Sequence, residues 1–128
     1  MYWSGNAMSI IPSIDEKAAA NNAKDYLRQF KDWQLISLRV DDSDPKATDQ
    51  EQLEHTRAIA ELKARQHIVA VVGKVDQASG IILDQRFIKR HRTKTTLAEL
   101  AANHYQITEG NFYHRQRKAL LMAYKFMH

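Results

Sequence analysis

The stretch TTLAELAANHYQITEGNFYHRQRKALL, residues 95–121, contains two helical patterns separated by a short break. In the first pattern apolar residues recur at helical spacing, and Thr96 with Glu99 three residues later resembles a capping box. We therefore expect a helix of about nine residues. Its inward face is expected to consist of Leu97, Leu100, Ala101 and Tyr105.

A longer helix is predicted after the break at Gln106 and Ile107, with Thr108 as its N-cap. Ile107 is expected to fill the corner between the two helices. The small Ala101 would let the second helix cross the first closely, so the spacing predicts a helix-turn-helix. The residues expected to face the core are Phe112, Ala119, Leu120 and Ala123.

The outward face near the start of this second helix carries residue types suited to duplex DNA. In a bound helix-turn-helix, early outward positions of the second helix enter the major groove. Asn111 can pair with adenine, Arg117 can pair with guanine, and Tyr113 and His114 can contact bases or backbone. Gly110 has no side chain, which would let the helix backbone approach the duplex.

The positive charge of the chain is concentrated in its last third. Residues 1–85 hold 10 Lys and Arg against 13 Asp and Glu, whereas residues 86–128 hold 9 against 2. The run RFIKRHRTK, residues 86–94, lies just before the first helix of the motif. Such a basic block fits a polyanion, although a solvated basic face without a partner is an equal alternative. We assign phosphate contacts to Arg90, Arg92, Lys94 and Lys118.

Helical periodicity also dominates the upstream sequence. Residues 14–33 predict an amphipathic helix that extends toward Leu38, with a stripe of small and aromatic residues in the core or at a subunit contact. Further helices are predicted at residues 50–72 and 81–88, with breaks at Gly73 and residues 76–80. Only IVAVVGKV, residues 68–75, could pass for a buried strand, so the predicted fold class is all-α. One side of the long helix is expected to carry Leu53, Ala60, Ala64, Ile68, Val71 and Val75, while Leu62 and Val69 lie elsewhere on it, so burial from two sides is expected.

The charge distribution and the predicted helices divide the chain into three segments. Residues 1–7, before Met8, are interpreted as a cloning scar. Residues 8–75 form a helical region for interaction or dimerisation, whose acidic balance makes it a poor DNA surface. Residues 76–128 form the C-terminal helix-turn-helix region. The chain has no cysteine, no apolar run long enough to cross a membrane and no signal-peptide pattern, so we expect a cytoplasmic protein.

Catalytic chemistry has little support in the sequence. No Ser, Thr or Lys nucleophile lies beside a base in a recognisable local pattern, and Gly73 with Lys74 lacks the other glycine of a phosphate loop. No two histidines share the spacing of a helical metal site, so neither a metal nor a cofactor is expected. The remaining candidates are interpreted as a solvated loop (Asp41, Asp42 and Asp44) and as ordinary surface or helix residues (His55 and His67).

TEGNFYHRQRKALLMAY, residues 108–124, resembles the C-terminal signature of phage ArpU/RinA-type transcriptional regulators. Upstream, ILDQRFIKR followed by LAELA is similar to the preceding helices of that family, so the resemblance covers about residues 80–127. The family resembles the region 4 helix-turn-helix of sigma factors and acts on late genes of phages. Arg115 stands where such patterns usually carry an apolar residue. The matching positions are Thr108, Phe112, Tyr113, Arg117, Lys118, Ala119 and Leu120.

The expected function is therefore sequence-specific binding of double-stranded DNA by a phage or prophage transcriptional regulator. RNA polymerase or other transcription machinery, and a second copy of the chain, are expected partners of the N-terminal region. The alternative is a non-catalytic helical adaptor that binds RNA or a protein through the basic C-terminal face. Specific RNA readers usually display several stacking aromatic residues beside the basic groove, and here only Tyr113 is a clear candidate.

Overall fold

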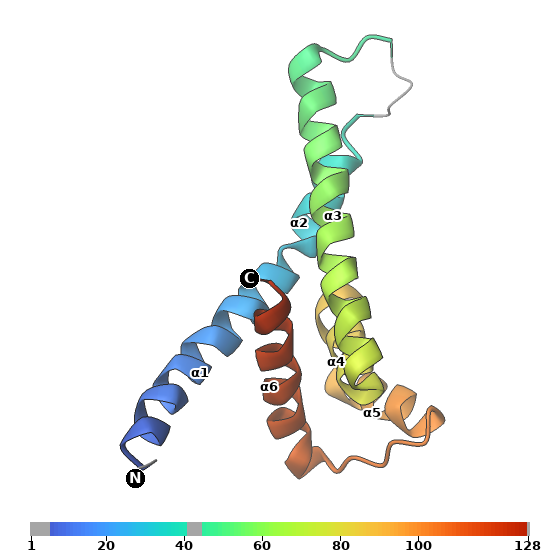
Figure 1. The fold of residues 1–128 in the computed structure, drawn as a ribbon. Helices are drawn as coiled ribbons and strands as arrows, with labels where there is room; N and C mark the ends of the chain where they lie inside the picture. The colour runs from blue at the N-terminus through green and yellow to red at the C-terminus, as the bar shows by residue number, and fades with distance from the viewer. Residues whose placement is uncertain (1–5, 41–44, 128) are drawn as a thin grey trace.

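All the regular secondary structure in the described part of the chain is helical, which confirms the all-α prediction. The computed structural model describes the backbone of residues 6–40 and 45–127, and side chains from residue 15 onward within those ranges. The strand alternative for residues 68–75 is wrong, because this segment lies inside a long helix. The elements are α1 (Asn6–Arg28), α2 (Phe30–Ser37), α3 (Asp49–Val75), α4 (Gln77–Leu83), the π-helical turn η1 (Asp84–Ile88), α5 (Thr93–Ala102) and α6 (Glu109–Phe126) (Figure 1).

Asp41, Asp42 and Asp44, interpreted above as a solvated loop, lie outside the described residues, as do residues 1–5 of the interpreted cloning scar. Within the described ranges, no helix combines the length and the apolar character that a membrane span requires.

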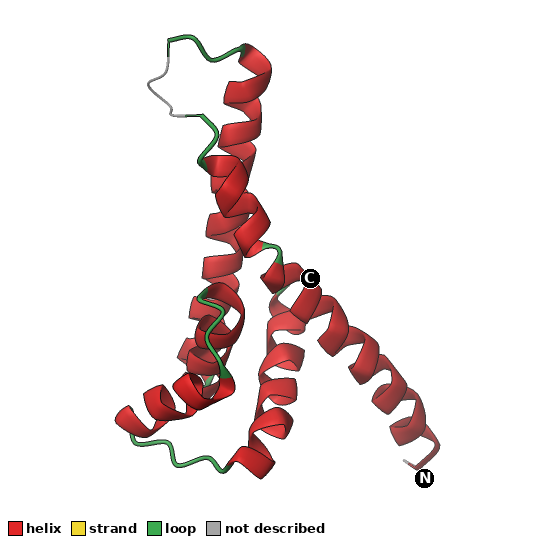
Figure 2. Cartoon of the chain, turned by 180° about the vertical axis from the view of Figure 1, so that it is seen from behind, coloured by secondary structure: helices red, strands yellow, loops and turns green. Residues whose placement is uncertain are grey.

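The helices form an arm and a body. In the arm, α2 lies along the first half of α3, and in the body α1, α4, α5, α6 and the end of α3 pack together (Figures 1 and 2). The last helix, α6, packs on α1, α4 and α3, whereas α5 packs chiefly on α4 and η1. The C-terminus lies near the junction of α1 and α2, and α1 diverges from α6 toward its own N-terminus (Figure 1).

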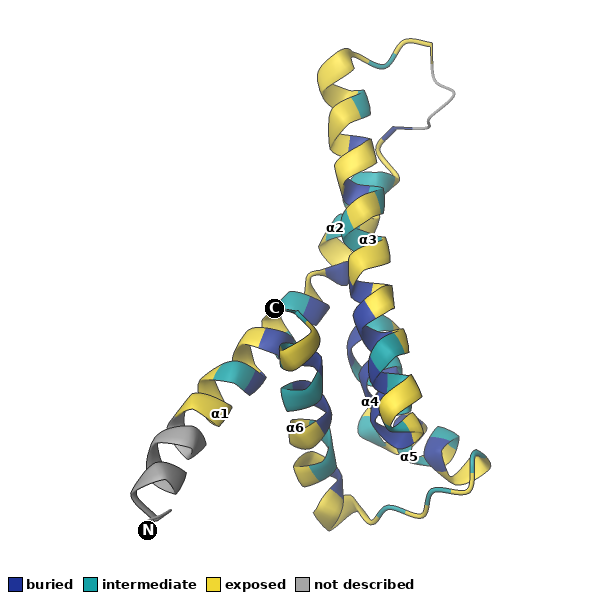
Figure 3. Cartoon of the chain, in the orientation of Figure 1, coloured by how far each residue is buried: buried dark blue, intermediate teal, exposed yellow. Residues whose placement is uncertain are grey.

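Two clusters of buried side chains hold the body together (Figure 3). The larger joins small and aliphatic residues of α1, α3 and α6 to Leu83 and Phe87. The smaller joins α4, α5 and α6, with the partly buried Ile107 packed against it as predicted for the corner. The four predicted core residues of α6 are all buried, which confirms the register of that helix: Phe112, Ala119, Leu120 and Ala123.

The junction of arm and body is built around Arg65, only 1% exposed. Its Nε donates to the Tyr26 carbonyl at the end of α1 (2.8 Å), where helical carbonyls lack partners within the helix. Its Nη1 pairs with Glu61 (2.8 Å), and its Nη2 donates to Gln29 Oε1 (2.7 Å). The guanidinium carbon also lies 3.9 Å from the centroid of the Tyr26 ring. Arg65 thus fixes the bend at Gln29 that separates α1 from α2.

The buried face of α3 differs from the predicted one. Leu53 and Val75 are 66% and 63% exposed, and Ala60 and Ala64 are exposed as well. His55, expected to be an ordinary surface or helix residue, is a buried residue of α3 whose Nδ1 lies 2.9 Å from the Ser37 carbonyl. Polar side chains occupy this face because α2 offers a carbonyl partner to His55 and the end of α1 offers one to Arg65. The buried residues of α3 are His55, Ala58, Arg65, Ile68, Val69 and Val72.

A capping box begins α3. The Thr48 hydroxyl accepts from the Glu51 backbone N–H (3.1 Å), and the Thr48 backbone N–H donates to Glu51 Oε1 (3.0 Å). The bond from the Thr48 backbone lowers the pKa of the Glu51 carboxyl below its ordinary value. The segment DDSDPKATD, residues 41–49, predicts a loop that ends in a helix N-cap, and Thr48 confirms the N-cap within the described residues.

The turn between α3 and α4 falls at Asp76, and neither Gly73 nor Gly80 breaks a helix. Instead the two glycines face one another where α3 and α4 cross. A Cβ placed on Gly80 would lie 2.5 Å from the Gly73 Cα, closer than real Cβ atoms come to backbone. The interpretation of these glycines as interruptions was wrong, because their small size serves the crossing of the helices.

The start of α5 lies earlier than predicted, at Thr93, with Arg92 as N-cap. Thr96 is consequently buried in the first turns, and its hydroxyl donates to the Arg92 carbonyl (3.0 Å), so it forms no capping box with Glu99. Ala101 is exposed and does not support a close crossing. The two helices of the predicted motif instead share α4 as a common support, with a connection of residues 103–108 between them.

Candidate nucleic-acid interface

Every residue that the sequence assigned to DNA binding is exposed. Thr108 occupies the N-cap position of α6 as predicted, although its side chain makes no capping bond. The helical register places Phe112 inward and its neighbours outward, which explains why the outward set was predictable. The exposed residues are Arg90, Arg92, Lys94, Thr108, Gly110, Asn111, Tyr113, His114, Arg117 and Lys118.

One groove joins the starts of α5 and α6. It has a volume of about 770 Å³ and brings Arg92 and Lys94 beside Gly110 and Tyr113. Glu109 is the only carboxylate in its lining, and it lies in the first turn of α6, where the helix dipole favours negative charge. We call this space the α5–α6 groove. Four of the ten predicted residues therefore meet in one place.

A second groove, of about 410 Å³, runs between α1 and η1 and is also lined by Tyr113. It contains Arg90 from the predicted set. No carboxylate lines this groove. We call it the α1–η1 groove. Its complete lining is Lys24, Arg28, Arg86, Phe87, Arg90, His91, Tyr113 and Gln116.

A third, smaller groove of about 190 Å³ lies between α1 and α6. Lys17 and Lys24 line it from α1, and Tyr113 and Arg117 line it from α6. Tyr113 therefore borders all three grooves, which together form a continuous basic surface. This surface draws on α1, the segment from η1 to α5, and α6, three parts of the chain that are distant in sequence.

Tyr113 holds a fixed place at the centre of the basic surface. Its hydroxyl lies 3.2 Å from the Thr93 hydroxyl, which ties α6 to the start of α5. Its ring meets the buried Phe112 ring edge to face, with centroids 5.4 Å apart and an interplanar angle of 86°. The side chain is nevertheless 59% exposed, so it can contact a ligand without moving.

Arg86, which lines two of the grooves, is held in place by hydrogen bonds to two parts of the chain. Its Nε donates to Gln116 Oε1 (3.1 Å), and its Nη1 donates to the His91 carbonyl (2.9 Å), so it joins α6 to the chain after η1. His91 in turn donates from Nδ1 to Gln85 Oε1 (2.7 Å). Between these anchors Arg90 has a φ of 59°, a left-handed conformation that a non-glycine residue seldom adopts. The turn therefore holds Arg86 and Arg90 in defined positions.

The structure divides the predicted residues into two groups. Thr108, Asn111, His114 and Lys118 line none of the three grooves and lie on the outward side of α6. The remaining six border the grooves. An outward helix face beside a basic surface can present base-reading side chains next to phosphate-binding ones.

Sequence reasoning missed the cations of α1. Lys17, Lys24 and Arg28 follow one another at spacings of seven and four residues, which places them on one stripe of the helix. Because the net charge of the N-terminal region is negative, a count of charges over the whole region did not reveal this basic stripe. The spacing alone could have revealed it, but only the packing of α1 on α6 shows that the stripe adjoins the predicted site.

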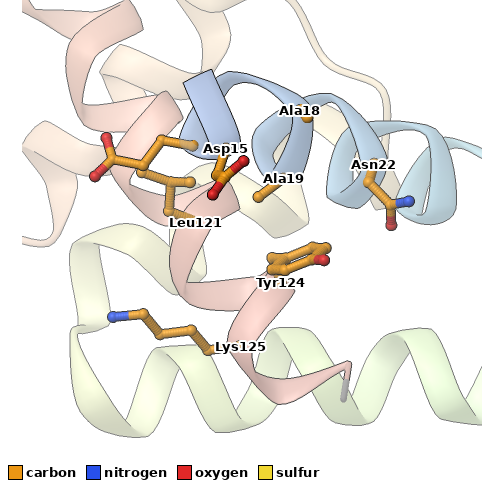
Figure 4. Close-up of a pocket in the computed structure, with 8 residues that line it drawn as sticks. Asp15, Ala18, Ala19, Asn22, Leu121, Tyr124 and Lys125 are labelled. Carbon is orange, nitrogen blue, oxygen red and sulfur yellow. The ribbon is translucent and has the colours of Figure 1, made fainter. Parts of the chain in front are cut away.

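A more apolar groove lies elsewhere. It has a volume of about 680 Å³ between α1 and the C-terminal half of α6, where Leu121 and Tyr124 face Ala19 (Figure 4). Asp15 and Glu16 border it, so it is separate from the basic surface. Within the described ranges, no three His, Asp or Glu side chains gather in a way that could hold a metal ion.

Comparison of the chain with protein-family models, curated proteins and solved structures gave no match.

Proposed function

We propose that the protein is a sequence-specific DNA-binding transcriptional regulator that docks the start of α6 in the major groove of duplex DNA. The observation that carries the proposal is the meeting of basic residues from η1, α5 and α6 around Tyr113, beside an exposed helix face that bears Asn111 and Arg117. A helix on a firm apolar support, flanked by cations, suits groove entry.

The exposed side chains contact different parts of the DNA. Asn111 and Arg117 contact base edges, since their planar donor groups match adenine and guanine. Tyr113 and His114 contact bases and backbone, and Gly110 allows the start of α6 to approach the duplex. Phosphates are held by Arg90, Arg92, Lys94 and Lys118.

The resemblance of residues 80–127 to ArpU/RinA-type regulators supports a phage or prophage origin and an action on late genes. The shared cluster of α4, α5 and α6 supports a helix-turn-helix arrangement in which α4 carries both later helices. The connection at residues 103–108 is longer than the usual turn of three or four residues. In the proposed arrangement, α5 and α6 therefore share α4 as a common support and do not cross each other closely.

Two alanine substitutions test the division of labour. Arg117→Ala is expected to cost about 1–3 kcal/mol of binding free energy on a specific site and to relax the preference at one base position. Lys94→Ala is expected to weaken specific and random duplexes alike. Both side chains are exposed, so thermal unfolding should be unchanged and serves as the control. Equal losses on specific and random DNA for both variants would contradict the assignment.

A further inference from the structure

Besides the residues of the proposed motif, α1 contributes cations to the same surface. Lys24 and Arg28 lie one helical turn apart and face Arg86 and Arg90 across the α1–η1 groove. His91 is also in the lining, and no carboxylate is. Among the described residues, neither Lys24 nor Arg28 belongs to an ion pair, whereas Lys89, just before Arg90, pairs with Asp84. Four like charges around one groove repel each other unless an anion enters it.

The acidic residues of α1 do not neutralise this groove. Asp15 and Glu16 border the apolar groove, and Asp25 is exposed without lining any of the three basic grooves. The helix therefore separates its charges by face. Its basic stripe lies beside α6 and η1.

We infer that α1 is a second phosphate-binding element, in which Lys24 and Arg28, with Arg86 and Arg90, hold backbone phosphates of the DNA that α6 reads. This inference rests on the proposed function. A phosphodiester backbone fits better than a single anion, because the α1–η1 groove continues past Tyr113 into the other two basic grooves. A strand of DNA carries a charge about every 3.4 Å, so it can occupy neighbouring grooves together.

Arg86 and Arg90 suit phosphate binding because the surrounding structure constrains their positions. The Arg86 guanidinium is oriented by Gln116 and the His91 carbonyl, and Arg90 is held by the left-handed turn. Lys24 and Arg28 stand on a helix whose buried residues pack against α6, so the two sides of the groove keep a constant separation. The groove is thus formed before DNA arrives, which lowers the entropy cost of binding.

The test compares three double variants of the full chain in DNA titrations over a range of salt concentrations. Lys24→Ala with Arg28→Ala is expected to lower the slope of log K against log salt by about 2, because two phosphate contacts are lost. Affinity should fall several-fold on specific and random duplexes alike, with base preference unchanged. Lys24→Arg with Arg28→Lys keeps both charges and should retain most of the slope.

The matched control is Lys63→Ala with Lys74→Ala, which removes two exposed cations of α3 that line none of the basic grooves. If the α1 variant behaves like this control while Arg117→Ala still loses specific binding, the inference fails and the proposed function stands. If the wild-type chain binds no duplex, both fail. A loss confined to single-stranded RNA, with duplex binding retained, would assign the groove to RNA and overturn the inference.

Discussion

Gly110 is the second residue of α6, and the fold does not require glycine there. A Cβ at this position would meet no atom within 4 Å, and its φ is not positive. In the helix interior glycine is less favourable than alanine by about 0.8–1.0 kcal/mol. A glycine that structure does not require, beside the groove that holds Arg92 and Lys94, supports a role in backbone approach to a ligand.

Gly110→Ala therefore separates stability from binding. We expect the free energy of unfolding to rise by up to about 1 kcal/mol, because alanine favours the helix. Affinity for a specific duplex is expected to fall about tenfold, equal to roughly 1.4 kcal/mol, because the methyl group holds the backbone away from DNA. Chemical denaturation and a DNA titration give the two numbers. Unchanged affinity would remove Gly110 from the interface.

For single residues, exposure could be predicted correctly from the sequence where the periodicity of one helix determines it. The register of α6 follows from Phe112 and the small residues after it, so the outward residues were identified correctly. His55 and Arg65 were beyond the reach of such reasoning. Their burial depends on carbonyl partners in α2 and α1, which lie 18 and 39 residues away in the chain. Periodicity within one helix carries no information about such partners.

Among the elements, α3 and α4 approach each other closely at Gly73 and Gly80. The backbones approach so closely that no Cβ fits on Gly80. This crossing positions α4 against α5 and α6, because Ala78 and Ile82, on either side of Gly80, belong to the cluster that contains Leu100 and Phe112. The position of the candidate DNA-binding helix therefore depends on a pair of glycines far from the basic surface.

Gly80→Ala is expected to destabilise the protein by about 1–3 kcal/mol, as overpacking of a tight contact does. Gly73→Ala is the matched control, because its Cβ would lie 3.7 Å from the Gly80 Cα, an ordinary contact. Thermal unfolding of the two variants should show a clear loss of Tm for the first and little change for the second. A similar loss in both would mean that the glycines act through the flexibility of the chain instead of through the crossing.

The order of the later helices was predictable, whereas the single helix predicted from residue 14 toward Leu38 is divided at Gln29 into α1 and α2, and several other boundaries also differ. The apolar periods gave each of the later helices, but Thr95 and Thr96 offered capping chemistry that the fold does not use. The start at Thr93 results from η1, because the turn after it leaves Arg92 extended at the N-cap position. A π-helical turn has no marker in the sequence, so the shift of the α5 boundary could not be predicted.

For the whole molecule, the charge distribution is the central feature. Counting charges along the chain placed the basic region after residue 85 and treated the earlier part as unsuited to DNA. Folding brings the stripe of Lys17, Lys24 and Arg28 beside that region. The predicted boundary at residue 75 coincides with the turn at Asp76, while the larger core cluster includes residues from both sides of it.

The central claim is that this basic surface reads the sequence of duplex DNA. Its most direct test is a competition titration of the purified chain against duplex fragments from the neighbourhood of its own gene, with scrambled competitor, at two salt concentrations. We expect a complex that resists the competitor at physiological salt, since base contacts persist when counterion release weakens. Binding that is equal on all fragments and disappears as salt rises would contradict it, and would reduce the surface to general attraction for polyanions.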